Sequence, residues 1–186
     1  MIGFAMCGSF CTHKKALEQM TLLIEKGYDI LPIMSENVYS TDTRFGRAED
    51  LQKKVGELCG REIISTIVDA EPIGPKAMLD ALVICPCTGN TLAKLAAGIT
   101  DTAVTMAAKA HLRSDRPLII TLASNDALSA NLKNIGTMLT KKQVYFVPMA
   151  QDDPINKPHS LVADFTLLLP TLECAVKGKQ YQKIFV

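Results

Sequence analysis

Small polar residues follow an apolar run in the middle of the chain, in an arrangement that could hold an anionic group. Residues 81–85 are apolar, and Pro86-Cys87-Thr88-Gly89-Asn90-Thr91 then leads into a helical pattern that ends at Gly98. A strand, a small polar loop and a helix start place N–H groups and a positive dipole end at the carboxyl edge of a sheet. The alternative is that Pro86, Gly89 and Asn90 only form a turn.

Two hydroxyl groups after other apolar runs fit the same chemistry. Gly8-Ser9-Phe10 follows the first run, and Ser35 ends the second. Gly3 and Gly8 have the glycine spacing of a P-loop, but Ser9 stands where that motif requires lysine. The sequence is therefore not a P-loop that binds a nucleoside triphosphate. G-x-G-x-x-G is also missing, and a hydroxyl at Ser35 suits a phosphate better than a ribose. Alternatively, Ser9 only caps the following helix.

Candidate groups for an anionic substrate lie near these turns. Arg44 lies in a long polar loop, residues 36–47, Lys94 follows the central loop, and Asn125 follows a later strand. Arginine suits bidentate contact with a carboxylate best. Further candidate cations are Lys133 and Lys157, and a loop at 151–159 leaves the same edge. Alternatively, Lys94 only faces solvent. The helix face at 131–134 could line the same site or only face solvent, and for this face we favour exposure to solvent.

The elements that must position these residues alternate between strands and helices. Strands are expected at residues 2–7, 28–34, 62–68, 81–85, 118–123 and 143–148. Helices are expected at 12–26, 49–59, 92–97, 101–112, 124–140 and 160–176, the last interrupted at Pro170. This order predicts one α/β domain over residues 1–186, with a doubly wound, mostly parallel sheet of about six strands. All the marked turns would then meet at its carboxyl edge.

Composition narrows the functional class. The 186 residues are 48% hydrophobic with a net charge of +1, which favours a folded core and argues against nucleic-acid binding. No apolar run reaches the roughly 18 residues that a membrane span needs. The N-terminus reads as a first strand rather than a signal peptide, so we expect a cytoplasmic protein.

The cysteines could in principle hold a metal ion. Cys7, Cys11, Cys85 and Cys87 lie near the ends of two strands that could be neighbours. No pair has the C-x-x-C spacing of a zinc or redox motif. We therefore expect buried thiols in a reducing compartment and no metal.

The central segment P-C-T-G-N-T-L-A-K-L-A-A-G-I-T-D resembles P-A-[ST]-A-N-T-I-A-K-x-A-x-G-I-x-D, the signature of the flavin-dependent cysteine decarboxylase family. The turn at Gly8-Ser9-Phe10 resembles that family's G-S-I turn. The resemblance implies that Asn125 binds a substrate carboxylate. It also implies an FMN cofactor held at Gly8, Ser9, Phe10, Ser35, Pro86, Thr88, Gly89, Asn90 and Thr91. The family's catalytic histidine is missing near residues 66–69, which argues against decarboxylation.

Three segments, residues 2–12, 85–95 and 147–165, resemble one branch of this flavoprotein superfamily more closely. That resemblance implies a sporulation oxidoreductase in the mother-cell cytoplasm, which aromatises a dihydropyridine dicarboxylate together with a nicotinamide-binding subunit. Removing hydride from such a ring gains aromaticity, so the protein need only position the ring against an acceptor. It further implies a homo-oligomer, a trimer or larger. The alternatives are a non-catalytic scaffold that activates the nicotinamide-binding partner, and a retained FMN-dependent decarboxylase.

Overall fold

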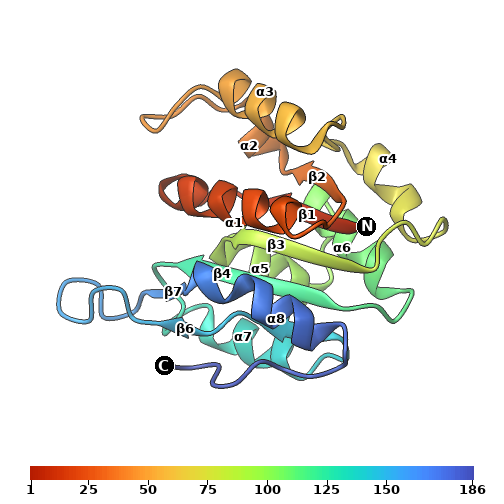
Figure 1. Ribbon diagram of the computed structural model, residues 1–186. Helices are drawn as coiled ribbons and strands as arrows, with labels where there is room; N and C mark the ends of the chain where they lie inside the picture. Colours follow the sequence, from red (N-terminus) through yellow and green to blue (C-terminus); the bar gives the residue numbers. More distant parts are fainter.

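Five parallel strands form the centre of the molecule. In the computed structural model, which describes residues 1–186, they lie in the order β2-β1-β3-β4-β5. Figure 1 shows the first four of them side by side. Their bounds are β1 (Ile2–Met6), β2 (Ile30–Met34), β3 (Ala81–Cys87), β4 (Leu118–Ser124) and β5 (Val144–Phe146). The residues of all five are buried. This burial explains their continuous apolar runs and confirms the predicted α/β class.

Two short strands make the sheet mixed. β7 (Leu161–Ala163) runs antiparallel to the end of β4, and β6 (Met149–Ala150) runs antiparallel to β7. The C-terminal tail then lies along β6, where Met149 and Phe185 form a bridge. The helix predicted from residue 160 is therefore wrong in its first part, because these residues complete the ladder of β4. The helix begins only at α8 (Leu168–Ala175), after a 3-10 turn at Phe165–Leu167.

The strand predicted at residues 62–68 is wrong. Only Ile64 pairs, in an isolated bridge with Ile33. The Thr66 side chain accepts a hydrogen bond from the Asp69 N–H and starts the short helix α4 (Ile67–Ala70), and a 3-10 turn follows at Glu71–Ile73. Val68 is 79% exposed, so the β-branched run has no second face to pack against.

Helices cover both faces of the sheet. Figure 1 shows α1 (His13–Glu25) and α8 on one face, with α5 (Gly89–Ala97), α6 (Ala103–Leu112) and α7 (Leu132–Leu139) on the other. A 3-10 turn at Phe10–Thr12 precedes α1, and α2 (Glu36–Ser40) and α3 (Ala48–Cys59) follow β2. Gly60 and Gly98 end α3 and α5 in the left-handed conformation, as predicted. α7 begins eight residues later than expected, because the residues after Ser124 form turns.

Residues outside the sheet form hydrogen bonds with both edge strands of its parallel part, β2 and β5. Outside β2, the Ile64 N–H donates to the Pro32 carbonyl and the Met34 N–H donates to the Ile64 carbonyl. Outside β5, the Gln180 side chain accepts from the Phe146 N–H at 2.9 Å and donates to the Phe146 carbonyl at 2.6 Å. No helix in the structure is both long and apolar enough to span a membrane.

Candidate functional site

The turns after β1, β2 and β3 lie side by side at the carboxyl edge. The Ser35 N–H donates to the Met6 carbonyl at 3.0 Å, and the Cys7 N–H donates to the Pro86 carbonyl at 3.2 Å. The chain leaves β1 toward β2 on one side and returns to β3 on the other. Such a reversal in strand order opens a crevice where open α/β sheets bind ligands, and in the 2-1-3-4-5 order that crevice holds FMN in flavodoxin.

The β1–α1 turn leaves several donors free. The Ser9 carbonyl accepts hydrogen bonds from the Thr12 N–H at 2.9 Å and the Thr12 hydroxyl at 2.8 Å. The Ser9 side chain caps nothing, so the alternative of a simple capping serine is wrong. The N–H groups of Gly8 and Ser9 donate to no protein acceptor. Two N–H groups and one hydroxyl therefore remain for a ligand at this turn.

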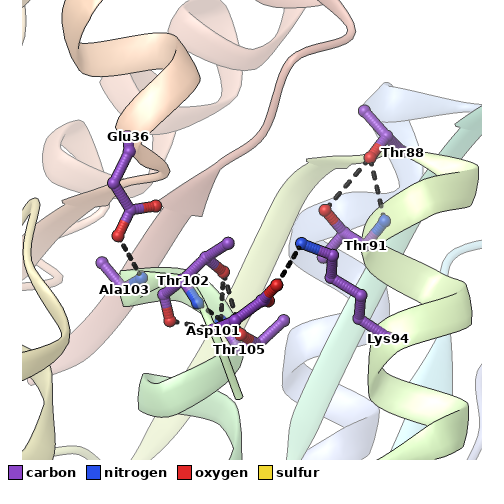
Figure 2. A network of polar contacts seen from close by, with 8 residues as sticks. All are labelled: Glu36, Thr88, Thr91, Lys94, Asp101, Thr102, Ala103 and Thr105. Atoms are coloured by element: carbon purple, nitrogen blue, oxygen red, sulfur yellow. Dashed lines mark hydrogen bonds and ion pairs between the residues drawn. The ribbon is translucent and has the colours of Figure 1, made fainter. Parts of the chain in front are cut away.

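At the start of α5, the hydroxyl groups of Thr88 and Thr91 form hydrogen bonds within the protein. The Thr88 hydroxyl accepts from the Thr91 N–H at 3.1 Å and donates to the Thr91 hydroxyl at 3.0 Å. Figure 2 shows these two bonds between Thr88 and Thr91. Thr91 in turn donates to the Cys7 sulfur at 3.3 Å, which links this turn to the residue that follows β1. The free groups are the N–H groups of Gly89 and Asn90 and the exposed Asn90 side chain. At this turn the backbone, rather than the threonine hydroxyls, is available for a ligand.

Because Gly89 has no side chain, the β4–α7 loop packs closely against the start of α5. A Cβ at residue 89 would lie 2.4 Å from the Ser124 hydroxyl and 2.6 Å from the Asn131 amide nitrogen. Both groups bind the Asp126 carboxylate, at 2.6 and 2.9 Å, and their hydrogen bonds lower the pKa of Asp126. Asn131 is thus buried and bonded, and its predicted exposure is wrong. Asn125, in the same loop, is exposed and has no side-chain partner.

Ser35 and Glu36 both serve as helix caps. The Ser35 hydroxyl accepts from the Val38 N–H at 3.4 Å and starts α2. The Glu36 carboxylate accepts from the Ala103 N–H at 3.0 Å, at the start of α6 (Figure 2). A capping box between Thr102 and Thr105 completes that helix end. Glu36 is therefore held against α6 and does not serve as the free carboxylate of a ribose site.

The predicted substrate cations differ in availability. Lys94 forms an ion pair with Asp101 at 2.9 Å, with only 22% of its side chain exposed, and Lys157 pairs with Asp152. Arg44 lies in its exposed loop, 4.8 Å above the ring of Phe45. Lys133 lines a groove of about 670 Å³ between α5 and α7, together with Asn90 and Asn134. Arg44 and Lys133 remain free, whereas Lys94 is neutralised within the fold.

His13 lies beside the β1–α1 turn, and the sequence analysis did not select it as a candidate. Its ring is buried at the start of α1, with Nε2 2.8 Å from the Cys7 carbonyl. Its pKa is lowered by burial, although the Cys7 carbonyl acts to raise it. Burial also raises the pKa of the Cys7 thiol to about 11, so this sulfur is no thiolate at neutral pH. A histidine four residues after the Gly8-Ser9 strand-end turn was the available signal.

The cysteines are all free. Cys7, Cys85 and Cys87 are buried as expected, but Cys11 is exposed. No group of three or more His, Cys, Asp or Glu side chains in the molecule is arranged to hold a metal ion.

The fold and this edge define the class of the protein. Residues 1–165 match the family described as Flavoprotein, and the chain belongs to that family. Within it, the chain is 44% identical over 185 residues to the B subunit of dipicolinate synthase from Bacillus subtilis (strain 168). The match covers 100% of this chain and 92% of the relative. The closer resemblance predicted from the three segments is therefore confirmed.

Solved structures agree with this assignment. The crystal structure of the B subunit of dipicolinate synthase from Bacillus halodurans C has a TM-score of 0.91 at 41% identity, covering 100% of this chain and 95% of that one. AnUbiX (PadA1), solved in complex with FMN and dimethylallyl pyrophosphate, has a TM-score of 0.60 at 19% identity. That match covers 79% of this chain and 76% of the other, and it shows a shared fold.

Proposed function

We propose that this chain is the B subunit of a dipicolinate synthase, which oxidises dihydrodipicolinate to dipicolinate with FMN and works with an A subunit. The observation that carries the proposal is that the turns after β1, β2 and β3 lie side by side at the carboxyl edge, with unpaired N–H groups at Gly8, Ser9, Gly89 and Asn90. The 44% identity to a named B subunit supports the substrate. A cytoplasmic location in the sporulating mother cell and assembly into a trimer or larger homo-oligomer belong to the same proposal.

The donor set fits a phosphorylated flavin. The phosphate would bind the Gly8 and Ser9 N–H groups and the Ser9 hydroxyl, since these have no protein partners. Gly89 and Asn90 would add N–H donors from α5, which has nine residues and a positive N-terminal end. Four further predicted residues already form hydrogen bonds within the protein, so they would shape the cofactor site without donating to FMN. Phe10 would border the flavin ring. Those four are Ser35, Pro86, Thr88 and Thr91. When bound, FMN supplies a two-electron acceptor.

The chain's own residues would hold and orient the substrate. Asn125 offers a free amide to one carboxylate, and Arg44 offers a guanidinium from its loop. Lys94, the third predicted substrate group, is paired with Asp101 and would bind the substrate only if that ion pair opened. Positioning a ring against an acceptor accounts for much of the rate in such reactions.

A visible absorption spectrum of the purified chain tests the cofactor. We expect a yellow protein that releases FMN on denaturation. Dihydrodipicolinate oxidation is then measured with and without the A subunit, and dipicolinate should appear only in reactions that contain this chain. A colourless chain that cannot be reconstituted with FMN would contradict the proposal.

A second candidate function is that of a flavin-free scaffold that activates the A subunit. The pairing of Lys94 with Asp101 favours it, because a predicted substrate cation is thereby neutralised. In that case, the colourless chain would still raise the activity of the A subunit. A retained decarboxylase is less favoured, since no histidine lies in or beside α4.

A further inference from the structure

A cleft of about 550 Å³ lies between α1 and α3, beside the β1–α1 turn. Its size is within the range of small-molecule sites. Phe10 and Leu17 contribute apolar surface on one side, and Leu51 contributes apolar surface from α3. Because Phe10 also belongs to the turn that the proposed function assigns to FMN, the cleft adjoins the proposed cofactor site.

The charged groups around this cleft favour an anion. Lys14 and Lys54 line it from α1 and α3 and form no ion pair within the protein. Arg47 also lines it and pairs with Glu49 at 3.0 Å, but both side chains are mostly exposed, so the pair is weak and exchangeable. Glu18 is the one carboxylate in the lining. Three cations around an apolar surface match a flat ring that carries carboxylates.

His13 gives the cleft a proton acceptor. It lines the cleft next to Phe10, and the two ring centroids are 5.1 Å apart. A carbonyl oxygen only accepts hydrogen bonds, so Nε2 must carry the proton that it donates to the Cys7 carbonyl. The neutral ring then has its lone pair on Nδ1, which has no protein partner. The lowered pKa of His13 keeps this lone pair free at neutral pH.

We propose that this cleft binds the pyridine dicarboxylate ring and that Nδ1 of His13 accepts the proton that the ring loses on oxidation. The inference rests on the proposed function for the identity of the ring. Lys14, Arg47 and Lys54 bind the carboxylates in place of Asn125, which does not line this cleft, and the apolar surface packs against the ring.

The step balances in atoms and electrons. A dihydropyridine holds two more hydrogens than a pyridine. One ring carbon loses a hydride, with its electron pair, to the flavin or nicotinamide acceptor. A neighbouring ring atom loses a proton to Nδ1, and the electrons of that bond complete the aromatic ring. The substrate is oxidised, the acceptor is reduced, and the His13 imidazolium later returns its proton to water while Nε2–H still donates to the Cys7 carbonyl.

Binding of the product tests the cleft without any turnover. Calorimetric titration of the full chain with dipicolinate compares the double variant Lys14→Gln/Lys54→Gln with Lys15→Gln/Lys53→Gln. The second pair lies one residue away on the same two helices, removes the same charge and does not line the cleft. We expect about a tenfold loss of affinity for each cleft lysine and little change in the control. Equal losses in both variants, or no binding to the wild type, would overturn the cleft assignment.

The proton role is tested with His13→Gln, whose amide can still donate to the Cys7 carbonyl. In the oxidation assay with the A subunit, we expect kcat to fall by about a hundredfold or more, as for loss of a general base. The affinity for dipicolinate should stay within about twofold of the wild type, since the cleft lysines remain. A kcat within about threefold of the wild type would overturn this role. If the wild type itself fails to oxidise the substrate, the proposed function fails, while the titration still decides the cleft.

Discussion

Glu36 and Ala103 are joined by a hydrogen bond of 3.0 Å, from the Ala103 N–H to the Glu36 carboxylate, although they lie 67 residues apart. The bond links the first turn of α2, directly after Ser35, to the first turn of α6. A carboxylate at a helix start satisfies an unpaired N–H and meets the positive end of the dipole. The position of the β2–α2 turn thus depends on α6.

Replacing Glu36 with alanine should therefore destabilise the chain by about 1–2 kcal/mol, toward the lower end of the range for a hydrogen bond to a charged group, because Glu36 is exposed to solvent. Urea unfolding followed by circular dichroism measures the change. Asn37→Ala serves as the control, since the Asn37 side chain is exposed and forms no hydrogen bond. Equal stability of both variants would show that the Glu36 bond contributes nothing.

Gly89→Ala should destabilise by about 1–3 kcal/mol, because the new methyl group would overlap Ser124 and Asn131 in a bonded network. Gly136→Ala is the matched control in α7, where nothing lies within 4 Å of an added Cβ. That change should stabilise by about 0.5–1 kcal/mol through helix propensity. Thermal unfolding distinguishes the two, and a stable Gly89→Ala variant would mean that the loop can move away.

Alanine substitutions at Ser9 and Thr88 should distinguish an effect on cofactor binding from an effect on stability. Ser9→Ala should leave the unfolding free energy within about 0.5 kcal/mol of the wild type, since its hydroxyl caps nothing. Its affinity for FMN should fall about tenfold or more, through loss of a hydrogen bond to phosphate. Thr88→Ala should cost about 1 kcal/mol of stability, because it removes the cap of α5. Fluorescence titration with FMN measures the affinity, and an unchanged Kd for Ser9→Ala would exclude it from the site.

Stability should fall as the pH drops below about 6.5, the ordinary pKa of histidine. Burial lowers the pKa of His13 and of His111 below that value, so the unfolded chain binds protons that the folded chain does not. Unfolding then takes up at most about two protons, and the free energy of unfolding decreases toward acid pH. Melting temperatures measured from about pH 7.5 to about pH 5 check this. The double variant His13→Gln/His111→Gln should show a flatter profile, and an identical slope would refute the assignment.

The region around β3 could largely be predicted from the sequence, because its signals are local. The apolar run, the polar turn and Gly98 each define one boundary of a strand or helix. The strand nevertheless continues through Pro86 to Cys87, two residues past the predicted end. The ladder with β4 shifts register between Ile84 and Cys87, and such an irregularity accommodates a proline within a strand.

The errors arose where tertiary partners decide the local structure. Residues 62–68 are β-rich, but only Ile64 finds a partner at the edge of β2. Residues 161–163 continue a helical pattern, yet they pair with the end of β4. Asn131 lies on a polar stretch, and its burial depends on Asp126 and on the absence of a side chain at Gly89. Long-range contacts of this kind leave little trace in local periodicity.

The hydrogen bonds to the outer edges of β2 and β5 have a consequence for how the chain associates with others. Ile64 and Gln180 already fill outward-facing backbone positions on the two flanking strands. Pairing of an added strand with a sheet edge is a common route to both peptide recognition and aggregation. At these backbone positions of β2 and β5, such pairing is blocked by the bonds already present. Contacts with further copies or with a different protein would therefore use side chains of the helices and loops, where they can be redesigned without disturbing the ladder.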